Sequence, residues 1–162
     1  MSIDTLKITG GTPLKGELNA AGAKNAITKL LIASILSNKK CVFFNVPNIG
    51  DVEITLALCK EVGMQVSWDK NTRTLETITP ELKTTVISQK FSGANRIPIL
   101  LLGALLGRTN EEILVPTLGG DALGSRPLDF HIQALQKLGA EVQYIEGENG
   151  SNYHAKAPNG GM

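Results

Sequence analysis

Apolar residues form helical runs in two parts of this chain, and the features around these runs recur in the same order. The runs lie at 30–36 and 100–106, and each follows a Gly-Ala pair that begins at Gly22 or Gly93. A Val-Pro pair and a second helical run come after each of them. The chain therefore contains two copies of one supersecondary unit, which must stack on sister copies because it cannot bury its own apolar face.

The second helical run of each copy gives the most detailed match. Its apolar positions follow the spacing i, i+4, i+7 and i+10, at Val52, Leu56, Cys59 and Val62 in the first copy and at Leu128, Ile132, Leu135 and Leu138 in the second. Gly63 and Gly139 end these runs, because glycine tolerates the left-handed conformation that is common after a helix. The second copy has extra residues between its Val-Pro pair and this run, and they form the glycine-rich loop 119–127.

Within a unit the pattern predicts a strand, a helix, a strand, a helix and a two-stranded hairpin, which is an α/β fold of repeated βαβαββ units. In the first unit the predicted helices are 23–37 and 51–62, and the predicted strands are 15–20, 41–46, 65–68 and 74–78. We expect Asp51 to cap the second helix, because its carboxylate can accept hydrogen bonds from the free amides of the first turn.

Composition and charge narrow the possible function classes. With 162 residues, of which 42% are hydrophobic and 19% charged, the chain can bury one sizeable core. Its formal net charge of +1 gives no electrostatic footprint for nucleic acid or for an acidic membrane. The longest apolar run, 97–107, is too short to span a bilayer, and the first residues do not resemble a signal peptide, so we expect a cytoplasmic protein.

The cysteines and histidines do not indicate a metal site. Cys41 begins a predicted strand and Cys59 lies on the apolar face of a predicted helix, and their spacing is not that of metal ligands. We expect both cysteines to be buried small hydrophobic residues. The 2 histidines also lack the spacing of paired ligands, so no metal is expected.

Both copies place a cation at the start of their first helix, in Lys24-Asn25 and in Asn95-Arg96. A cation at the positive end of a helix dipole is disfavoured unless an anion lies between it and the free amides. The repetition therefore favours a binding site for phosphate or carboxylate. The alternative is a solvated cation at a helix end.

The loop 119–127 contains the second group of candidate residues. Asp121 lies among glycines, in a loop that can close over a ligand and bring an acid to it, although an aspartate in a simple turn has the same pattern. Arg126 precedes Pro127 and suits bidentate contact with a phosphate or carboxylate, and Asp129 can bind a polar ligand. The alternative is that Arg126 and Asp129 only cap the helix or pair with each other.

Several of these segments together resemble one family of enzymes. They are Gly22-Ala23-Lys24-Asn25-Ala26, Val46-Pro47 followed by Asp51-Val52, and the stretch from Gly119 to His131. In this order they resemble the UDP-N-acetylglucosamine 1-carboxyvinyltransferases of the enolpyruvyl transferase family, over essentially the whole chain. The resemblance implies an inside-out α/β barrel, or α-β prism, with three repeat units in each of two domains, so this chain supplies about two of six units.

The resemblance implies transfer of the enolpyruvyl group from phosphoenolpyruvate to the 3′-hydroxyl of UDP-N-acetylglucosamine with release of phosphate, the first step of peptidoglycan precursor synthesis. This chemistry needs positioning, proton transfer and charge neutralisation, so no cofactor and no metal are expected. By position, Lys24 and Asn25 resemble contacts to phosphoenolpyruvate, and Arg96 and Arg126 resemble the flanking cations. The segment similar to the one that holds the uridine nucleotide consists of Arg126, Pro127, Leu128, Asp129 and Phe130.

Asp121 occupies the position at which most of these enzymes have cysteine and some have aspartate. The resemblance implies that Asp121 is the catalytic acid, which delivers a proton to C3 of phosphoenolpyruvate if the closed site keeps it protonated. It also implies insensitivity to fosfomycin, which alkylates the cysteine, because a carboxylate is a far poorer nucleophile than a thiolate.

The resemblance also suggests domain boundaries. Residues 1–21 correspond to strands that pack in the second domain, and 22–162 correspond to an incomplete first domain with units at about 22–80 and 81–162. The chain is then the N-terminal part of a longer enzyme, inactive without its C-terminal half, and its exposed apolar faces favour self-association. Two alternatives stay open, namely a short non-catalytic UDP-sugar-binding or structural module and another enolpyruvyl transferase, such as the shikimate-pathway enzyme.

Overall fold

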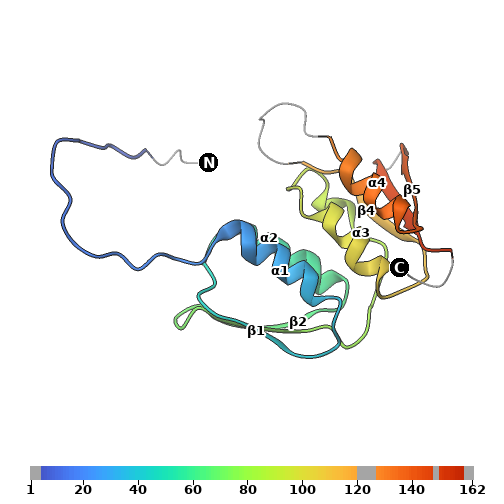
Figure 1. The fold of residues 1–162 in the computed structure, drawn as a ribbon, viewed down its shortest axis with the longest axis horizontal. Helices are drawn as coiled ribbons and strands as arrows, with labels where there is room; N and C mark the ends of the chain where they lie inside the picture. The colour runs from blue at the N-terminus through green and yellow to red at the C-terminus, as the bar shows by residue number, and fades with distance from the viewer. Residues whose placement is uncertain (1–4, 120–126, 148–149, 159–162) are drawn as a thin grey trace.

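The computed structural model describes residues 5–119, 127–147 and 150–158, and two similar α/β units follow one another in it (Figure 1). The first unit consists of α1 (Lys24–Ser34), β1 (Cys41–Phe43), α2 (Gly50–Glu61), β2 (Gln65–Asp69) and β3 (Thr74–Ile78). The second consists of α3 (Pro98–Leu106), β4 (Ile113–Pro116), α4 (Asp129–Lys137), β5 (Glu141–Ile145) and β6 (Asn152–Lys156), and a 3-10 turn, Gln89–Phe91, precedes it.

The two sheets have the same topology. The strand orders are β1-β3-β2 and β4-β6-β5, and all four pairings are antiparallel. In both units the last strand lies between the other two, so strands at equivalent positions of the repeat occupy equivalent places in space. The predicted α/β fold of repeated units is confirmed.

Most local predictions for the first unit are also confirmed. The two predicted helices overlap α1 and α2, and the predicted strand 74–78 coincides with β3. Gly63 follows α2 with a φ of 113°, as expected for the residue after a helix. A Cβ atom at Gly63 would also lie 2.5 Å from the carbonyl oxygen of Glu81, so glycine is required both by conformation and by space.

Two local predictions are wrong. No strand forms at 15–20, because residues 5–21 lie along neither sheet and extend away from the two units (Figure 1). Their apolar side chains are exposed to solvent, and Leu14 is 99% exposed. Asp51 does not cap α2, because the helix already begins at Gly50 with Ile49 at the capping position, and Asp51 lies in the first turn.

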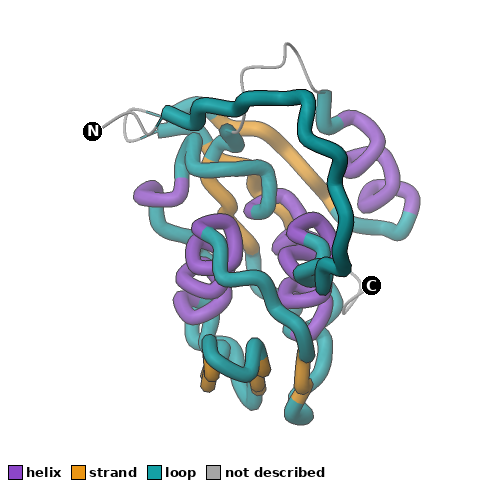
Figure 2. Tube along the Cα trace, turned by 90° about the vertical axis from the view of Figure 1, so that its left-hand side faces the viewer, coloured by secondary structure: helices purple, strands orange, loops and turns teal. Residues whose placement is uncertain are grey.

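The core lies where the helices of the two units meet. α1 packs on both α2 and α3, and helices of the two units lie next to each other in Figure 2. α3 is apolar on all sides, and Leu101, Leu102 and Leu105 within it are completely buried. Arg108, just after α3, joins the units by donating hydrogen bonds to the backbone carbonyls of Ile35, Thr79 and Pro80. No helix in the described ranges is long and apolar enough to cross a membrane.

The second helices of the two units differ in burial although the spacing of their apolar residues matches. In α2 the repeated apolar positions are buried, and Val62 at its C-terminal end is completely inaccessible. In α4 no residue is buried, and the equivalent Leu138 is 66% exposed. The first unit therefore covers the apolar face of its second helix, whereas the apolar face of α4 is only partly covered: Leu128, Ile132 and Leu135 pack against the core, and Leu138 is open to solvent.

Candidate functional site

The cations that the sequence placed in separate repeats line one cavity of about 440 Å³. Its polar lining residues are Lys24, Asn25, Thr28, Lys29, Asp51, Asn95 and Arg96. The first turns of α1 and α2 supply part of the wall, and the segment that leads into α3 supplies the rest. The fold thus brings Lys24, Asn25 and Arg96 to one cavity.

Three helices begin at this cavity, and none of them has a side-chain N-cap. Ala23, Ile49 and Ile97 occupy the capping positions of α1, α2 and α3, and their side chains accept no hydrogen bond from the first turn. The first amides of a helix have no intrahelical partner and carry the positive end of its dipole. A ligand with phosphate or carboxylate oxygens can take the place of the missing caps.

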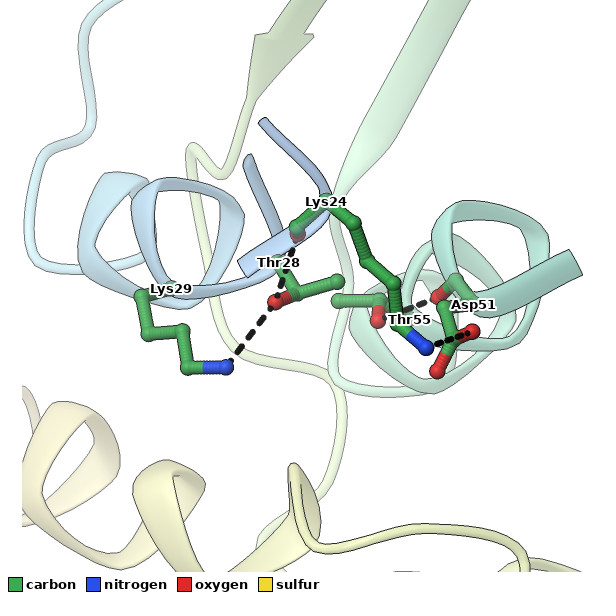
Figure 3. Close-up of polar contacts among 5 residues, drawn as sticks. All are labelled: Lys24, Thr28, Lys29, Asp51 and Thr55. Atoms are coloured by element: carbon green, nitrogen blue, oxygen red, sulfur yellow. Dashed lines mark hydrogen bonds and ion pairs between the residues drawn. The ribbon is translucent and has the colours of Figure 1, made fainter. Parts of the chain in front are cut away.

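Lys24 extends from the first turn of α1 toward α2, where its Nζ lies 2.8 Å from Oδ2 of Asp51 (Figure 3). Both side chains are partly exposed, 56% for Lys24 and 37% for Asp51, so this ion pair is worth at most about 1 kcal/mol. Asp51 therefore holds the ammonium group of Lys24 beside the cavity, and a ligand that takes over this ammonium group loses little free energy by breaking the ion pair.

Lys29 adds a third basic group to the cavity. Its Nζ donates to the hydroxyl of Thr28 at 3.3 Å, and that hydroxyl in turn donates to the carbonyl of Lys24 at 3.3 Å (Figure 3). Among the described lining residues, three cations therefore face a single carboxylate, Asp51. The cavity has an excess of positive charge and attracts anions.

The charge of Arg96 acts on Tyr153 of the second sheet. Burial raises the pKa of Tyr153, its neighbour Tyr144 raises it further, and the positive charge of Arg96 lowers it. The two rings lie 5.0 Å apart between centroids. Among the described residues no carboxylate forms an ion pair with Arg96, so its charge is available to a ligand.

The described end of the loop 119–127 is attached to the same segment. The amide of Gly119 donates to the carbonyl of Asn95 at 3.1 Å, and the amide of Gly93 donates to the carbonyl of Thr117 at 3.1 Å. A Cβ atom at Gly119 would lie 1.8 Å from the carbonyl oxygen of Gly93, so no other residue fits there. The loop therefore departs from the edge of the cavity.

The remaining predicted site residues fall into two groups. Asp121 and Arg126 lie outside the described residues. The others, Pro127, Leu128, Asp129 and Phe130, lie at the start of α4 and do not line the cavity. Phe130 is 83% exposed and Asp129 is also exposed, so this segment presents side chains and backbone to solvent.

Sequence reasoning missed three lining residues that carry a charge or an amide. The sequence predicts Asp51 only as a helix cap, and the packing of α1 on α2 places its carboxylate beside Lys24. Lys29 follows Lys24 by five residues, a spacing that does not place two side chains on one stripe of a helix. Asn95 was recognised only as the neighbour of Arg96, and its burial to 9% exposure has no signal in the sequence.

The cysteines take no part in this site. Cys59 is completely buried, as predicted, and burial raises the pKa of its thiol to about 12. Cys41 is only half-buried, so its predicted burial is wrong in degree, because it begins the short edge strand β1. Within the described ranges no three His, Cys, Asp or Glu residues are grouped as metal ligands.

The family model for EPSP synthase (3-phosphoshikimate 1-carboxyvinyltransferase) matches residues 8–162. The chain belongs to this enolpyruvyl transferase family. Within the family it is 62% identical over 158 residues to the UDP-N-acetylglucosamine 1-carboxyvinyltransferase of Protochlamydia amoebophila, a match that covers 98% of this chain and 34% of that protein. The enzyme of the same name from Thermus thermophilus is 42% identical, over 93% of this chain and 34% of its own length. This enolpyruvyl transferase chain thus spans about a third of the length of the curated relatives it matches.

Solved structures of enolpyruvyl transferases have the same fold. The enolpyruvyl transferase NikO from Streptomyces tendae superposes with a TM-score of 0.72 at 16% identity, covering 91% of this chain and 31% of that structure. EPSP synthase from Acinetobacter baumannii gives a TM-score of 0.61 at 18% identity, over 90% of this chain and 32% of its own. The two repeat units therefore correspond to about a third of the enolpyruvyl transferase fold.

Proposed function

We propose that this chain is part of an enzyme that transfers the enolpyruvyl group of phosphoenolpyruvate to the 3′-hydroxyl of UDP-N-acetylglucosamine in peptidoglycan precursor synthesis, in the cytoplasm. The observation that carries the proposal is the cavity at which Lys24, Arg96 and three uncapped helix starts meet. Phosphoenolpyruvate has a phosphate and a carboxylate, and free amides with two or three cations suit such an anion. Its acceptor substrate is proposed from the high identity to the UDP-N-acetylglucosamine enzymes.

The residues of the cavity have distinct roles in this proposal. Lys24 and Asn25 bind phosphoenolpyruvate, and Arg96 and Arg126 neutralise its negative charge as the tetrahedral intermediate forms. In the first step the 3′-hydroxyl adds to C2, its proton is lost, and C3 gains a proton. In the second step C3 loses a proton, the C2–O bond to phosphate breaks, and inorganic phosphate leaves.

Asp121 is the proton donor to C3 in this proposal. A carboxylic acid at this position gives general acid catalysis without a thiol, and the chain needs no cysteine in the site. The expected consequence is resistance to fosfomycin. Mass spectrometry of the chain after incubation with fosfomycin should show no adduct, and stoichiometric labelling at Asp121 would contradict this role.

Leu128, Asp129 and Phe130, with Arg126 and Pro127 before them, hold the uridine nucleotide in this proposal. Support comes from their exposed position at the start of α4, where an aromatic ring and free backbone amides are accessible. The domain assignment also belongs to the proposal: residues 1–21 pack in the second domain of the complete enzyme, and 22–162 form the incomplete first domain.

The test joins this chain to the part of the Protochlamydia enzyme that lies beyond the matched region and measures phosphate release with both substrates. We expect release with UDP-N-acetylglucosamine and none with shikimate 3-phosphate. Lys24→Ala should lower the rate by about 100-fold, the typical loss when a charge-stabilising group is removed. Lys39→Ala is the matched control, because Lys39 is exposed and remote from the cavity lining. Release with shikimate 3-phosphate instead would assign the chain to the sister reaction.

The isolated chain provides the second arm of the test. We expect it to release no phosphate and to associate with itself through its exposed apolar faces, as the partly open face of α4 suggests. A monodisperse chain that binds UDP-N-acetylglucosamine saturably without turnover, and whose fusion is also inactive, would instead indicate a non-catalytic binding module.

A further inference from the structure

Asn95 is the one buried side chain in the described lining of the cavity that keeps an unused polar atom. The residue is 9% exposed and lies directly before Arg96. Its Oδ1 accepts a hydrogen bond from the amide of Ile97 at 2.9 Å, and its own backbone carbonyl accepts from Gly119. Its Nδ2 is buried, and no described residue accepts a hydrogen bond from it.

The orientation of this side-chain amide is determined by its surroundings. An amide N–H such as that of Ile97 can only donate, so the atom 2.9 Å away must be the oxygen of Asn95 and the other atom must be the nitrogen. The two hydrogens of Nδ2 therefore have no acceptor among the described residues. Buried polar groups in native proteins are nearly always paired, and an unpaired one in a cavity calls for a partner from outside the chain.

The surroundings specify the chemistry of that partner. Lys24, Lys29 and Arg96 line the same cavity, and Asp51 is its single described carboxylate, which already pairs with Lys24. An acceptor that enters this cavity is therefore an anionic oxygen, because the cations draw in negative charge. Nδ2 has almost no exposed surface, so ligand binding must shift the cavity wall slightly to reach it.

We propose that Asn95 is a further ligand-binding residue, whose side-chain amide donates a hydrogen bond to a phosphate or carboxylate oxygen of a small phosphorylated acid bound between α1 and α3. This inference rests on the proposed function, and it adds a neutral donor to the cations of the same site. Because Oδ1 holds the amide of Ile97, the donor is oriented before the ligand arrives, which lowers the entropic cost of binding.

Asn95→Asp separates the two tasks of this side chain. The aspartate keeps an oxygen for the amide of Ile97, so the hydrogen bond in the segment before α3 is kept, but it replaces the donor with a carboxylate oxygen that repels an anion. The control is Asn71→Asp, which makes the same change of charge in an exposed turn outside the cavity, where the backbone amide of Asn71 donates to Asp69 at 2.9 Å. A cooperative thermal unfolding transition serves as the check that both variants are folded.

The binding measurement uses phosphoenolpyruvate, inorganic phosphate and UDP-N-acetylglucosamine as separate probes. We expect Asn95→Asp to weaken phosphoenolpyruvate binding by about tenfold or more, with Asn71→Asp equal to the original chain. In nuclear magnetic resonance spectra of the original chain, the side-chain amide signals of Asn95, assigned through the backbone resonances of the same chain, should shift with the same midpoint as binding. This second readout reports the hydrogen bond itself, so it stays decisive even if the variant does not fold.

Each outcome decides between the proposals. Saturable binding that leaves the Asn95 signals unmoved, or an Asn95→Asp variant that binds as tightly as the original, overturns the role of Asn95 and leaves the proposed function intact. Binding of phosphoenolpyruvate or phosphate that depends on Asn95, without binding of UDP-N-acetylglucosamine, supports the role of Asn95 and contradicts the proposed acceptor. A chain that binds none of the three probes overturns the role of Asn95 in this chain, and phosphate release by the fusion then decides the proposed function separately.

Discussion

Val62 and Leu138 occupy the same position of the repeat, yet the structure predicts opposite consequences for their truncation to alanine. Each lies at the C-terminal end of the second helix of its unit and precedes the glycine that ends it. Val62 is 0% exposed and Leu138 is 66% exposed. Leucine loses more atoms than valine, so a rule based on side-chain size alone expects the larger loss of stability at Leu138.

The magnitudes follow from burial. Val62→Ala removes two buried methyl groups at about 0.8 kcal/mol each and leaves a cavity that the core fills only in part, for a total of about 2–3 kcal/mol. Leu138 buries only about a third of its side chain, and a fully buried leucine contributes about 1.5–3 kcal/mol, so Leu138→Ala should cost about 0.5–1 kcal/mol. The smaller truncation should be the more damaging one.

The assay is urea unfolding followed by far-ultraviolet circular dichroism, with the single tryptophan, Trp68, as a fluorescence probe of the first unit. The difference in unfolding free energy between the variants is the measured quantity. Equal losses, or a larger loss for Leu138→Ala, would refute the reasoning, because they would mean that Leu138 is covered in solution. Repeating the experiment at several protein concentrations identifies self-association as the cover if the loss at Leu138 grows with concentration.

Three further predictions concern single residues. Gly119→Ala should abolish the binding of phosphoenolpyruvate, measured by calorimetry, because the added Cβ atom has no space beside Gly93. Unchanged affinity would show that the backbone at Gly119 can adapt. Arg108→Ala should lower the unfolding free energy by about 2–4 kcal/mol, since hydrogen bonds between the units are lost and buried carbonyls stay unpaired, whereas Arg108→Lys should recover part of it. At pH 8 a thiol reagent should modify Cys41 but not Cys59, because a thiol with a pKa of about 12 is ionised only to the order of 0.01%. The rate of modification at Cys59 should rise with pH. Rapid labelling of both cysteines in the folded chain would contradict the burial of Cys59.

Local structure was largely readable from the sequence because it depends on short-range order. The apolar spacing of α2 and the glycine after it, Gly63, give the helix and its end, and β-branched residues around a polar turn give the hairpin of β2 and β3. The strand expected at 15–20 failed for a physical reason. A strand is stable only when another strand completes its hydrogen bonds, and in the described chain residues 15–20 pair with neither sheet.

The candidate site was predictable only in part. Lys24, Asn25 and Arg96 were found because each repeat places a cation at a helix start, a signal that helix dipoles make meaningful. Asp51 and Lys29 were not found as site residues, because their contribution depends on which helices pack together. The local pattern around Asp51 is the same for a capping residue and for a partner of a distant lysine.

The sequence by itself determined the repeat, its helices and hairpins, and the resemblance to enolpyruvyl transferases, because periodicity, helix-ending glycines and motif residues are properties of neighbours along the chain. Only the tertiary structure decided that three uncapped helix starts share one cavity, that Asn95 keeps an unpaired donor beside it, and that the apolar face of α2 is buried whereas that of its counterpart α4 is partly open. The physical reason is that burial and electrostatic neighbourhood depend on contacts between residues far apart in sequence. Identical local patterns are compatible with either outcome, as Val62 and Leu138 demonstrate.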